Sequence, residues 1–286
     1  ALFKTYLGSI IDDKVWKGLA EGLNYGFGFM VIFMLHFTVA TKQPAMTAAR
    51  FAEAVEKNPQ GKTLNMKLAQ LLVDVFRSQS VAVLGNVVVA MGLAALIAFV
   101  YQHQTGEPLM NSENIAYQLH RIDPLDGSLW FAAIAGVWLF CSGIISGYFD
   151  NRSNYLNMRM RLAQHPLLKK LMSEKSRVKF ANYMHENYGS LIGNFCFGML
   201  LGLTGLVGYL THLPLDIRHV AFSSANLGYS AVSGQFAYPF FLQCIAFVLL
   251  IGLVNLMVSF SLTLWVALRS LNTEIDSWWA IWHEVC

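Results

Sequence analysis

Charged residues are scarce in this sequence. Asp, Glu, Lys and Arg make up 13% of its 286 residues, whereas soluble proteins carry about 25%. So little charge cannot coat a water-facing surface, which excludes soluble domains. Four cysteines are too few for a secreted disulfide scaffold, and an aromatic content of 13% excludes a disordered chain. Because 55% of the residues are apolar, the composition predicts a multi-pass membrane protein.

The sequence motifs of common catalytic and metal sites are also absent. None of the patterns CxxC, HExxH, GxSxG and GxxxxGK[ST] occurs, so nothing supports a metal site, a hydrolase or an NTPase. The net charge of +3 is too small to indicate a surface that coats DNA. We therefore expect no catalytic residues, no metal, no cofactor and no nucleic-acid partner.

Five long runs of the sequence contain no Asp, Glu, Lys or Arg. A helix needs about 20 mostly apolar residues to cross the hydrocarbon core of a bilayer. The runs predict an all-α integral membrane helical bundle with about five transmembrane helices. The predicted helices lie near residues 22–41, 79–101, 129–149, 190–211 and 240–268.

The last uncharged run is too long for one helix, and its first part differs in composition from the rest. Residues 220–238 are rich in Ser, Gly, Ala and Asn and would make a poor transmembrane span. A short re-entrant or interfacial helix is one interpretation, because irregular backbone at membrane depth must be buried in protein. A plain outer loop is the alternative.

Basic residues are distributed unequally between the connecting segments. Segments 42–77 and 150–189 carry six and eight Lys or Arg, whereas the opposite loops carry one each, Arg121 and Arg218. Lys and Arg are enriched in the cytoplasmic segments of membrane proteins. We therefore expect both basic segments in the cytoplasm, with the carboxy terminus on the same side. The lysines that precede the first span fit the opposite side poorly.

Each basic segment is predicted to form a helical hairpin, and the second is broken at His165-Pro166. One interpretation is that hairpins 42–77 and 150–189 contact the anionic headgroups of membrane lipids. The alternative is that they bind a protein partner.

The two halves of the sequence resemble each other. Leu84-Gly85-Asn86 and Ile192-Gly193-Asn194 each begin an apolar stretch, and a Pro-Leu pair follows each, with a period of about 108 residues. Two spans in each unit make the repeat parallel, as in one class of transporters, although repeats also build inert scaffolds. We expect a single membrane domain over residues 1–286. It would comprise repeat units at about 22–127 and 128–239, a closing span at 240–268 and an amphipathic tail at 272–286.

Five polar side chains fall within the apolar runs: Asn24, His36, Asn86, Asn194 and Asn255. We expect them to face protein, because hydrocarbon offers no hydrogen-bond partner. They either join helices or line a polar pathway, and Asn86 and Asn194 occupy equivalent positions in the two units. The absence of an acidic residue deep in any span disfavours a proton- or sodium-coupled pump.

Three outer-loop candidates, Asp216, Arg218 and His219, follow the second Pro-Leu pair. An ion pair between Asp216 and Arg218 would fix this loop. A solvated loop with a weak pair is the alternative interpretation.

Three tryptophans, Trp278, Trp279 and Trp282, cluster near the end of the sequence. Because tryptophan prefers the headgroup level of a bilayer, they predict a helix that lies on the inner membrane surface. A contact with a partner is the alternative.

Several long stretches resemble one known family. They are GLNYGFGFMVIFMLHFTVATKQPAMTAARFAEA, VFRSQSVAVLGNVVVA, the Gly147–Asn151 turn, LPLDIRHVAFSSANLGYS and LIGLVNLMVSFSLTLWVALRS. The chain resembles the bacterial "site-specific recombinase", or gonococcal-recombinase-like, family over nearly its whole length. Members of that family are longer, with an additional amino-terminal region, so the chain is similar to their carboxy-terminal membrane half. The bacterial inner membrane is the location that this resemblance implies.

The family label implies DNA strand exchange, for which the sequence offers no catalytic set. A tyrosine recombinase needs Arg, a His-x-x-Arg pair and Tyr in a soluble domain, and none of the eight histidines is followed by Arg at the third position. A serine recombinase needs a soluble strand-rich domain. We expect instead a non-enzymatic, transporter-like or permease-like subunit for solute, lipid or envelope material. The alternatives are a scaffold that anchors partners and, disfavoured, a recombinase.

Overall fold

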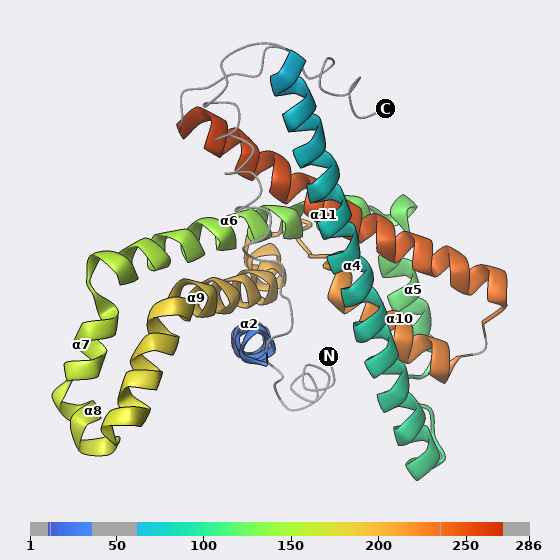
Figure 1. Cartoon of the computed structure of the whole chain (residues 1–286). Coiled ribbons are helices and arrows are strands. Elements are labelled where there is room, and N and C mark those ends of the chain that lie inside the picture. Colours follow the sequence, from blue (N-terminus) through green and yellow to red (C-terminus); the bar gives the residue numbers. More distant parts are fainter. Residues whose placement is uncertain (1–10, 12, 36–61, 235, 271–286) are drawn as a thin grey trace.

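A computed structural model describes residues 11, 13–35, 62–234 and 236–270 of this chain, and every element in these residues is a helix (Figure 1). The helices follow from the composition, because apolar runs in lipid must satisfy their backbone groups internally. In chain order the helices are α2 (Lys14–Met34), α4 (Lys62–Thr105), α5 (Ser112–Ile122), the short 3₁₀ helix η1 (Pro124–Asp126), α6 (Ser128–Tyr155), α7 (Met158–Gln164), α8 (Pro166–Leu171), α9 (Glu174–Thr211), α10 (Val220–Ser233) and α11 (Tyr238–Ser270).

Four segments of the described residues are long and apolar enough to cross a membrane. They are Arg77–Thr105, Ser128–Tyr155, Glu174–Thr211 and Tyr238–Ser270. They contain four of the five predicted spans, so the chain is an all-α membrane protein. The remaining prediction, residues 22–41, starts inside α2, and its residues 36–41 lie outside the described residues, as do the first arm of hairpin 42–77 and the tail 272–286.

Two long helices each combine a basic segment with a predicted span. Helix α4 runs without interruption from Lys62 to Thr105, and α9 runs from Glu174 to Thr211. The sequence predicts these basic segments as hairpin arms outside the spans. No proline interrupts either stretch, so the helix continues through the change from polar to apolar residues. Helix α8 begins at Pro166, where the sequence predicts a break.

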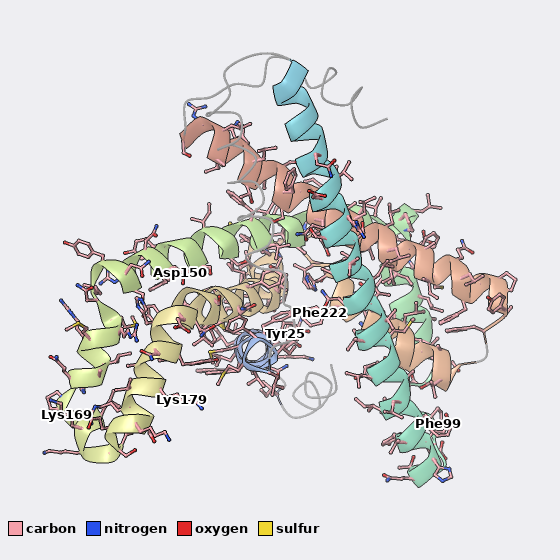
Figure 2. The ribbon with its side chains drawn as sticks, in the orientation of Figure 1. Tyr25, Phe99, Asp150, Lys169, Lys179 and Phe222 are labelled. Atoms are coloured by element: carbon pink, nitrogen blue, oxygen red, sulfur yellow. The ribbon has the colours of Figure 1, made fainter. Side chains whose placement is uncertain are left out.

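Small residues allow α2 and α6 to pack closely against α9. A Cβ atom on Gly202 would meet the backbone of Gly22, and one on Gly193 would lie 2.8 Å from the Ser146 Cβ. Close approach of this kind is the usual basis of helix association in lipid, where no hydrophobic force draws helices together. The backbone N–H of Gly189 also donates to Asp150 Oδ1 at 3.0 Å, which ties α9 to the end of α6 (Figure 2).

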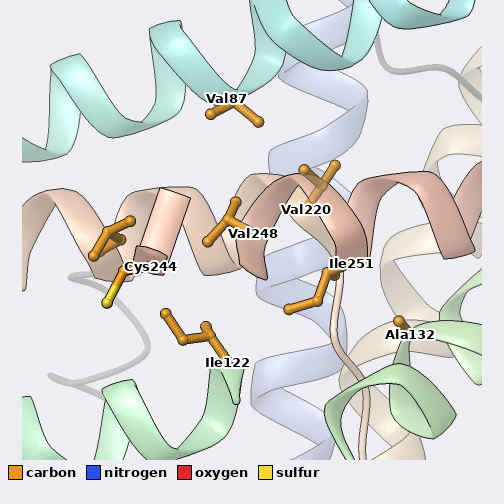
Figure 3. Packing of buried hydrophobic residues seen from close by; sticks show 8 residues of the cluster. Val87, Ile122, Ala132, Val220, Cys244, Val248 and Ile251 are labelled. Carbon is orange, nitrogen blue, oxygen red and sulfur yellow. The ribbon is translucent and has the colours of Figure 1, made fainter. Parts of the chain in front are cut away.

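A buried apolar cluster joins α10 and α11 to the first half of the chain. Its members include Val87 of α4, Ile122 of α5, Val220 of α10 and both Val248 and Ile251 of α11 (Figure 3). Helix α10 therefore lies buried against other helices. The alternative that residues 220–238 form a plain outer loop is wrong.

The described helices place the amino end of α2 beside the carboxyl end of α9. Lys14 Nζ lies 4.4 Å from the centre of the Tyr209 ring. Helices α7 and α8 connect α6 to α9 at the other end of these long helices (Figure 1). Lys14 and the basic α7–α8 connection therefore lie at opposite ends of the α2–α9 pair.

Six of the described helices form two similar series along the chain, with α2, η1, α7 and α8 outside them. A long helix, a short helix and a long helix begin at residues 62, 112 and 128, and again at residues 174, 220 and 238. The starts of the short helices are separated by the predicted period of about 108 residues.

Candidate functional site

A cavity of about 460 Å³ lies between α2, α5, α9, α10 and the loop that precedes α10. Its volume is in the range of small-molecule binding sites, roughly 300–1,000 Å³. Five charged side chains line the cavity: Lys17, Glu21, Arg121, Asp216 and Arg218. Aromatic side chains form other parts of the wall, including Tyr25 and Phe222, whose rings stack with centres 4.6 Å apart (Figure 2).

Two arginines share one carboxylate at this cavity. Arg121 Nη2 donates to both oxygens of Asp216 at 3.1 Å, and Arg218 Nη1 donates to Asp216 Oδ2 at 2.6 Å. Arg218 Nε also donates to the backbone oxygen of Arg121 at 2.7 Å, which links the loop directly to the end of α5. The predicted Asp216–Arg218 pair forms, and because the Arg218 side chain is only 9% exposed, the alternative of a solvated loop is wrong.

Burial and the neighbouring charges in this network shift the pKa values of Asp216 and Arg218. Burial alone would raise the pKa of Asp216, but the charges of Arg121 and Arg218, with hydrogen bonds from Arg218 and the Ile217 N–H, outweigh it and hold that pKa below its usual value. Burial and, next, the charge of Arg121 lower the pKa of Arg218, and together they outweigh the raising effects of Asp216 and Tyr117. An arginine nevertheless stays protonated at neutral pH. The network therefore carries two positive charges and one negative charge.

Asn255 of α11 fixes the loop that precedes α10 through hydrogen bonds to the backbone. Its Nδ2 donates to the backbone oxygens of Ala132 at 2.7 Å and Arg218 at 2.9 Å, and its Oδ1 accepts from the Val220 N–H at 3.1 Å. These bonds join α11, α6 and the start of α10. Asn255 is thus one of the predicted polar side chains that connects helices.

His219 lies in the wall of the cavity among aromatic rings. Its imidazole makes edge contacts with Phe29, Phe197 and Phe222, with ring centres 5.3 to 6.0 Å apart. Nδ1 of His219 is buried and has no hydrogen-bond partner among the described residues. Burial lowers the pKa of His219 to about 4, so the ring is neutral at pH 7.

A hydrogen bond joins the two short helices α5 and α10 at the cavity. Asn226 Nδ2 of α10 donates to Gln118 Oε1 of α5 at 2.9 Å, and the two residues are 108 positions apart in the chain. This separation equals the sequence period. The cavity therefore lies where the short helices of the two halves contact each other.

The other predicted polar residues lie away from the cavity lining or outside the described residues. Asn24 and Asn86 are half-buried. Asn194 is fully buried, and its Nδ2 donates to the Ser190 oxygen of its own helix at 2.8 Å. None of the three lines the cavity. His36 and the three tryptophans Trp278, Trp279 and Trp282 lie outside the described residues.

Sequence reasoning missed most of the cavity residues, including the charged Lys17, Glu21 and Arg121. Two of them carried a signal: Arg121 was the only Lys or Arg of its predicted outer loop, and Lys17 was a lysine on the side that the basic-residue count disfavours. Both residues are unexpected for their positions in the sequence, and the fold brings both side chains to the cavity. Within the described residues, no group of three His, Cys, Asp or Glu side chains is arranged to hold a metal ion.

Comparison with known proteins gives one match. A family model described as "Site-specific recombinase" matches residues 1–286 of the chain. No curated protein and no solved structure matches it. The chain therefore belongs to the family that this model describes.

Proposed function

We propose that this chain, which belongs to the family described as site-specific recombinase, is a non-enzymatic, transporter-like or permease-like subunit in the bacterial inner membrane. The cavity between α2, α5, α9 and α10 would be the place where its solute, lipid or envelope material binds. The observation that carries this proposal is a cavity lined by five charged side chains in a chain with only 13% charged residues.

The position of the cavity supports the proposal. In many transporters the substrate site lies at the interface between structural repeats. Here Gln118 and Asn226, which are 108 residues apart, bond to each other at the cavity wall. Helix α10 supplies further residues of the cavity wall. A short helix can lie at membrane depth when it is buried in protein.

The distribution of basic residues supports an orientation with α7 and α8 in the cytoplasm. The cavity would then open near the outer surface, because Lys17 and the loops before α5 and α10 lie at the opposite end of the long helices. The carboxy terminus would be cytoplasmic.

The second candidate function is a scaffold that anchors partners through its basic hairpin. The observation that favours it is the surface of α7 and α8. Basic side chains such as Lys169 project there (Figure 2), and the apolar Leu171 is 79% exposed. Anionic lipid headgroups would also satisfy these side chains, so the surface by itself supports an anchor less strongly than the cavity supports a binding site.

A cavity variant and a matched glycine control separate the two candidates. A Cβ atom on Gly205, which lines the cavity, and one on Gly147, which does not, would each meet no atom within 4 Å. We expect Gly205→Trp to fill the cavity and to abolish complementation of a deletion strain, scored as sensitivity to detergents and large antibiotics. Gly147→Trp should complement normally.

A hairpin variant completes the test. Replacing four exposed lysines by glutamine, Lys169, Lys170, Lys175 and Lys179, should leave complementation intact if the cavity carries the function. Loss of complementation in this variant, with full activity of Gly205→Trp, would overturn the proposal in favour of the scaffold. Melting temperatures in detergent identify any variant that fails to fold.

A further inference from the structure

The charges around the cavity do not balance. Among the described residues, the lining has three basic side chains, Lys17, Arg121 and Arg218, and two acidic ones, Glu21 and Asp216. His219 contributes no charge at pH 7, because burial lowers its pKa to about 4. The lining therefore carries one excess positive charge. A partly enclosed site strengthens the interaction of that charge with an anion, because fewer waters screen it.

Arg121 has hydrogen-bonding capacity that Asp216 does not use. A guanidinium has five N–H donors, and the bonds to Asp216 come from Nη2 alone. Arg121 Nε is buried and has no hydrogen-bond partner among the described residues. A buried donor without a partner is costly, so a ligand oxygen that reached Nε would remove a cost that the unliganded site carries.

The guanidinium of Arg121 is held in place for such a ligand. Its central carbon lies 5.4 Å from the centre of the Tyr117 ring, which also lines the cavity. The side chain is 19% exposed, so it remains accessible from the cavity. Arginine in a fixed orientation recognises the oxygens of carboxylates and phosphates through paired hydrogen bonds.

Lys17 brings a second positive charge to the cavity from α2. A lysine near the outer end of a span runs against the distribution of basic residues in membrane proteins, and the fold offers a reason for it. Lys17 is half-buried in the lining, whereas the exposed Lys14, one turn earlier, contacts Tyr209 and does not line the cavity.

We infer that the cavity binds an oxyanion, a phosphate or a carboxylate, through Arg121 and Lys17. This inference rests on the proposed function and names the class of its ligand. Neutral polar groups such as Asn226 and Gln118 would bind the remainder of the molecule, and Tyr25 and Phe222 would cover its less polar part. A lipid headgroup and a free anionic solute share this chemistry.

The purified chain in neutral detergent tests the inference by ligand-dependent thermal stabilisation. Inorganic phosphate and acetate are titrated against chloride at equal ionic strength. In parallel, the chain is melted in nanodiscs of phosphatidylglycerol and of phosphatidylcholine. A saturable rise in melting temperature with phosphate or acetate identifies a free anion. A rise only in phosphatidylglycerol identifies the headgroup of an anionic lipid.

Three variants decide whether the anion binds at this cavity. Arg121→Lys keeps the charge but loses Nε, and Lys17→Gln removes the second charge without touching the Asp216 network. We expect each to weaken binding about tenfold or more, the value of one charge-assisted hydrogen bond. Lys14→Gln removes an equal charge from the same helix and should bind as the wild type does. If Arg121→Lys does not fold, Lys17→Gln alone decides.

Two results would overturn the inference. One is the absence of stabilisation by both anions and by phosphatidylglycerol, and the other is equal stabilisation of the wild type and Lys17→Gln. Neither result bears on the Gly205→Trp complementation test. If the cavity is essential in cells but binds no anion, the proposed function is still supported. Only the inference that its ligand is an anion would then be wrong.

Discussion

Asn255 illustrates how a single polar side chain organises the packing around the cavity of this membrane protein. It lies on the apolar helix α11, is 2% exposed, and has three backbone partners on α6, on the loop before α10 and at the first residue of α10. The loop positions Arg218 for its bond to Asp216. The ion network thus depends on an amide that lies outside the cavity itself.

Replacing Asn255 by leucine should lower the stability of the protein. The change leaves the buried Val220 N–H without its acceptor, at a cost of about 1–3 kcal/mol. The melting temperature in detergent measures the effect. Gln243→Leu is the matched control, because it removes an exposed amide from the same helix. Equal melting temperatures for the two variants would contradict the role given to Asn255.

His219 predicts a dependence of stability on pH. Its pKa is about 4 in the folded chain, below its ordinary value of 6.5. Between these values the unfolded chain binds the proton and the folded chain does not, so stability falls as pH is lowered, by up to about 1.4 kcal/mol per pH unit. The rings that surround His219 belong to phenylalanines, which do not titrate.

Melting temperatures between pH 7 and pH 5 test this prediction. His219→Leu, which has a similar volume and cannot be protonated, should flatten the profile in that window. Asp216 acts at lower pH, because its depressed pKa contributes stability that is lost only as pH falls through the folded-state value, below 3.8. An unchanged slope in His219→Leu would show that another group causes it.

At the scale of elements, the contact between α2 and α9 depends on the absence of side chains. Gly202 and Gly198 of α9 lie against the backbone of α2 at Gly22 and Tyr25. A side chain there would meet backbone atoms, which cannot rotate away as the end of a flexible side chain can. Helix α2 also carries Lys17 into the cavity, so this packing determines the position of one proposed ligand-binding residue.

Gly202→Val should therefore separate α2 from α9 and lower stability by about 1–3 kcal/mol, the usual cost of overpacking. Gly205→Ala on the same helix is the control, because its new Cβ would meet no atom within 4 Å. We expect this control to melt at or slightly above the wild-type temperature, since alanine favours a helix more than glycine does. A Gly202→Val protein as stable as the control would disprove the close packing.

At the scale of the whole molecule, the fold separates two chemically different ends. The cavity with its ion network lies at one end of the α2–α9 pair. The basic helices α7 and α8 lie at the other end (Figure 1). A chain with this asymmetry is expected to have one orientation in the membrane, set by its basic residues.

Cysteine labelling measures that orientation. In a chain whose four native cysteines are replaced by serine, Leu125→Cys, at a position that is 94% exposed beside the cavity end, should react with an impermeant maleimide in intact spheroplasts. Lys170→Cys on α8 should react only after the cells are opened. Preferential labelling of position 170 in intact spheroplasts would reverse the proposed topology.

The family name leads to a separate prediction about DNA. We expect the purified chain neither to cleave DNA nor to exchange its strands, because the sequence has no His-x-x-Arg pair of the kind a tyrosine recombinase uses. An assay on a supercoiled plasmid that carries two recombination sites measures this. Formation of recombined product by the purified chain would contradict this prediction and support the activity that the family name implies.

Local composition was sufficient to predict the membrane class, the all-α fold and the approximate positions of four spans. A helix in lipid needs a run of about 20 apolar residues, and such a run is visible in any short window of sequence. The break at Pro166 was predictable for a similar reason, since proline ends a helix through its own ring. These features depend on residues that are neighbours in the chain.

Only the tertiary structure decided the cavity. Arg121 and Asp216 are 95 residues apart, and Asn255 and Ala132 are 123 apart. Whether such residues meet depends on the packing of several helices at once, and composition does not encode that packing. The burial of α10 follows the same rule, because its Ser, Gly and Ala residues suit a loop in isolation and suit a buried helix once α4 covers them. Contacts between residues far apart in the chain therefore form the ion network and the cavity.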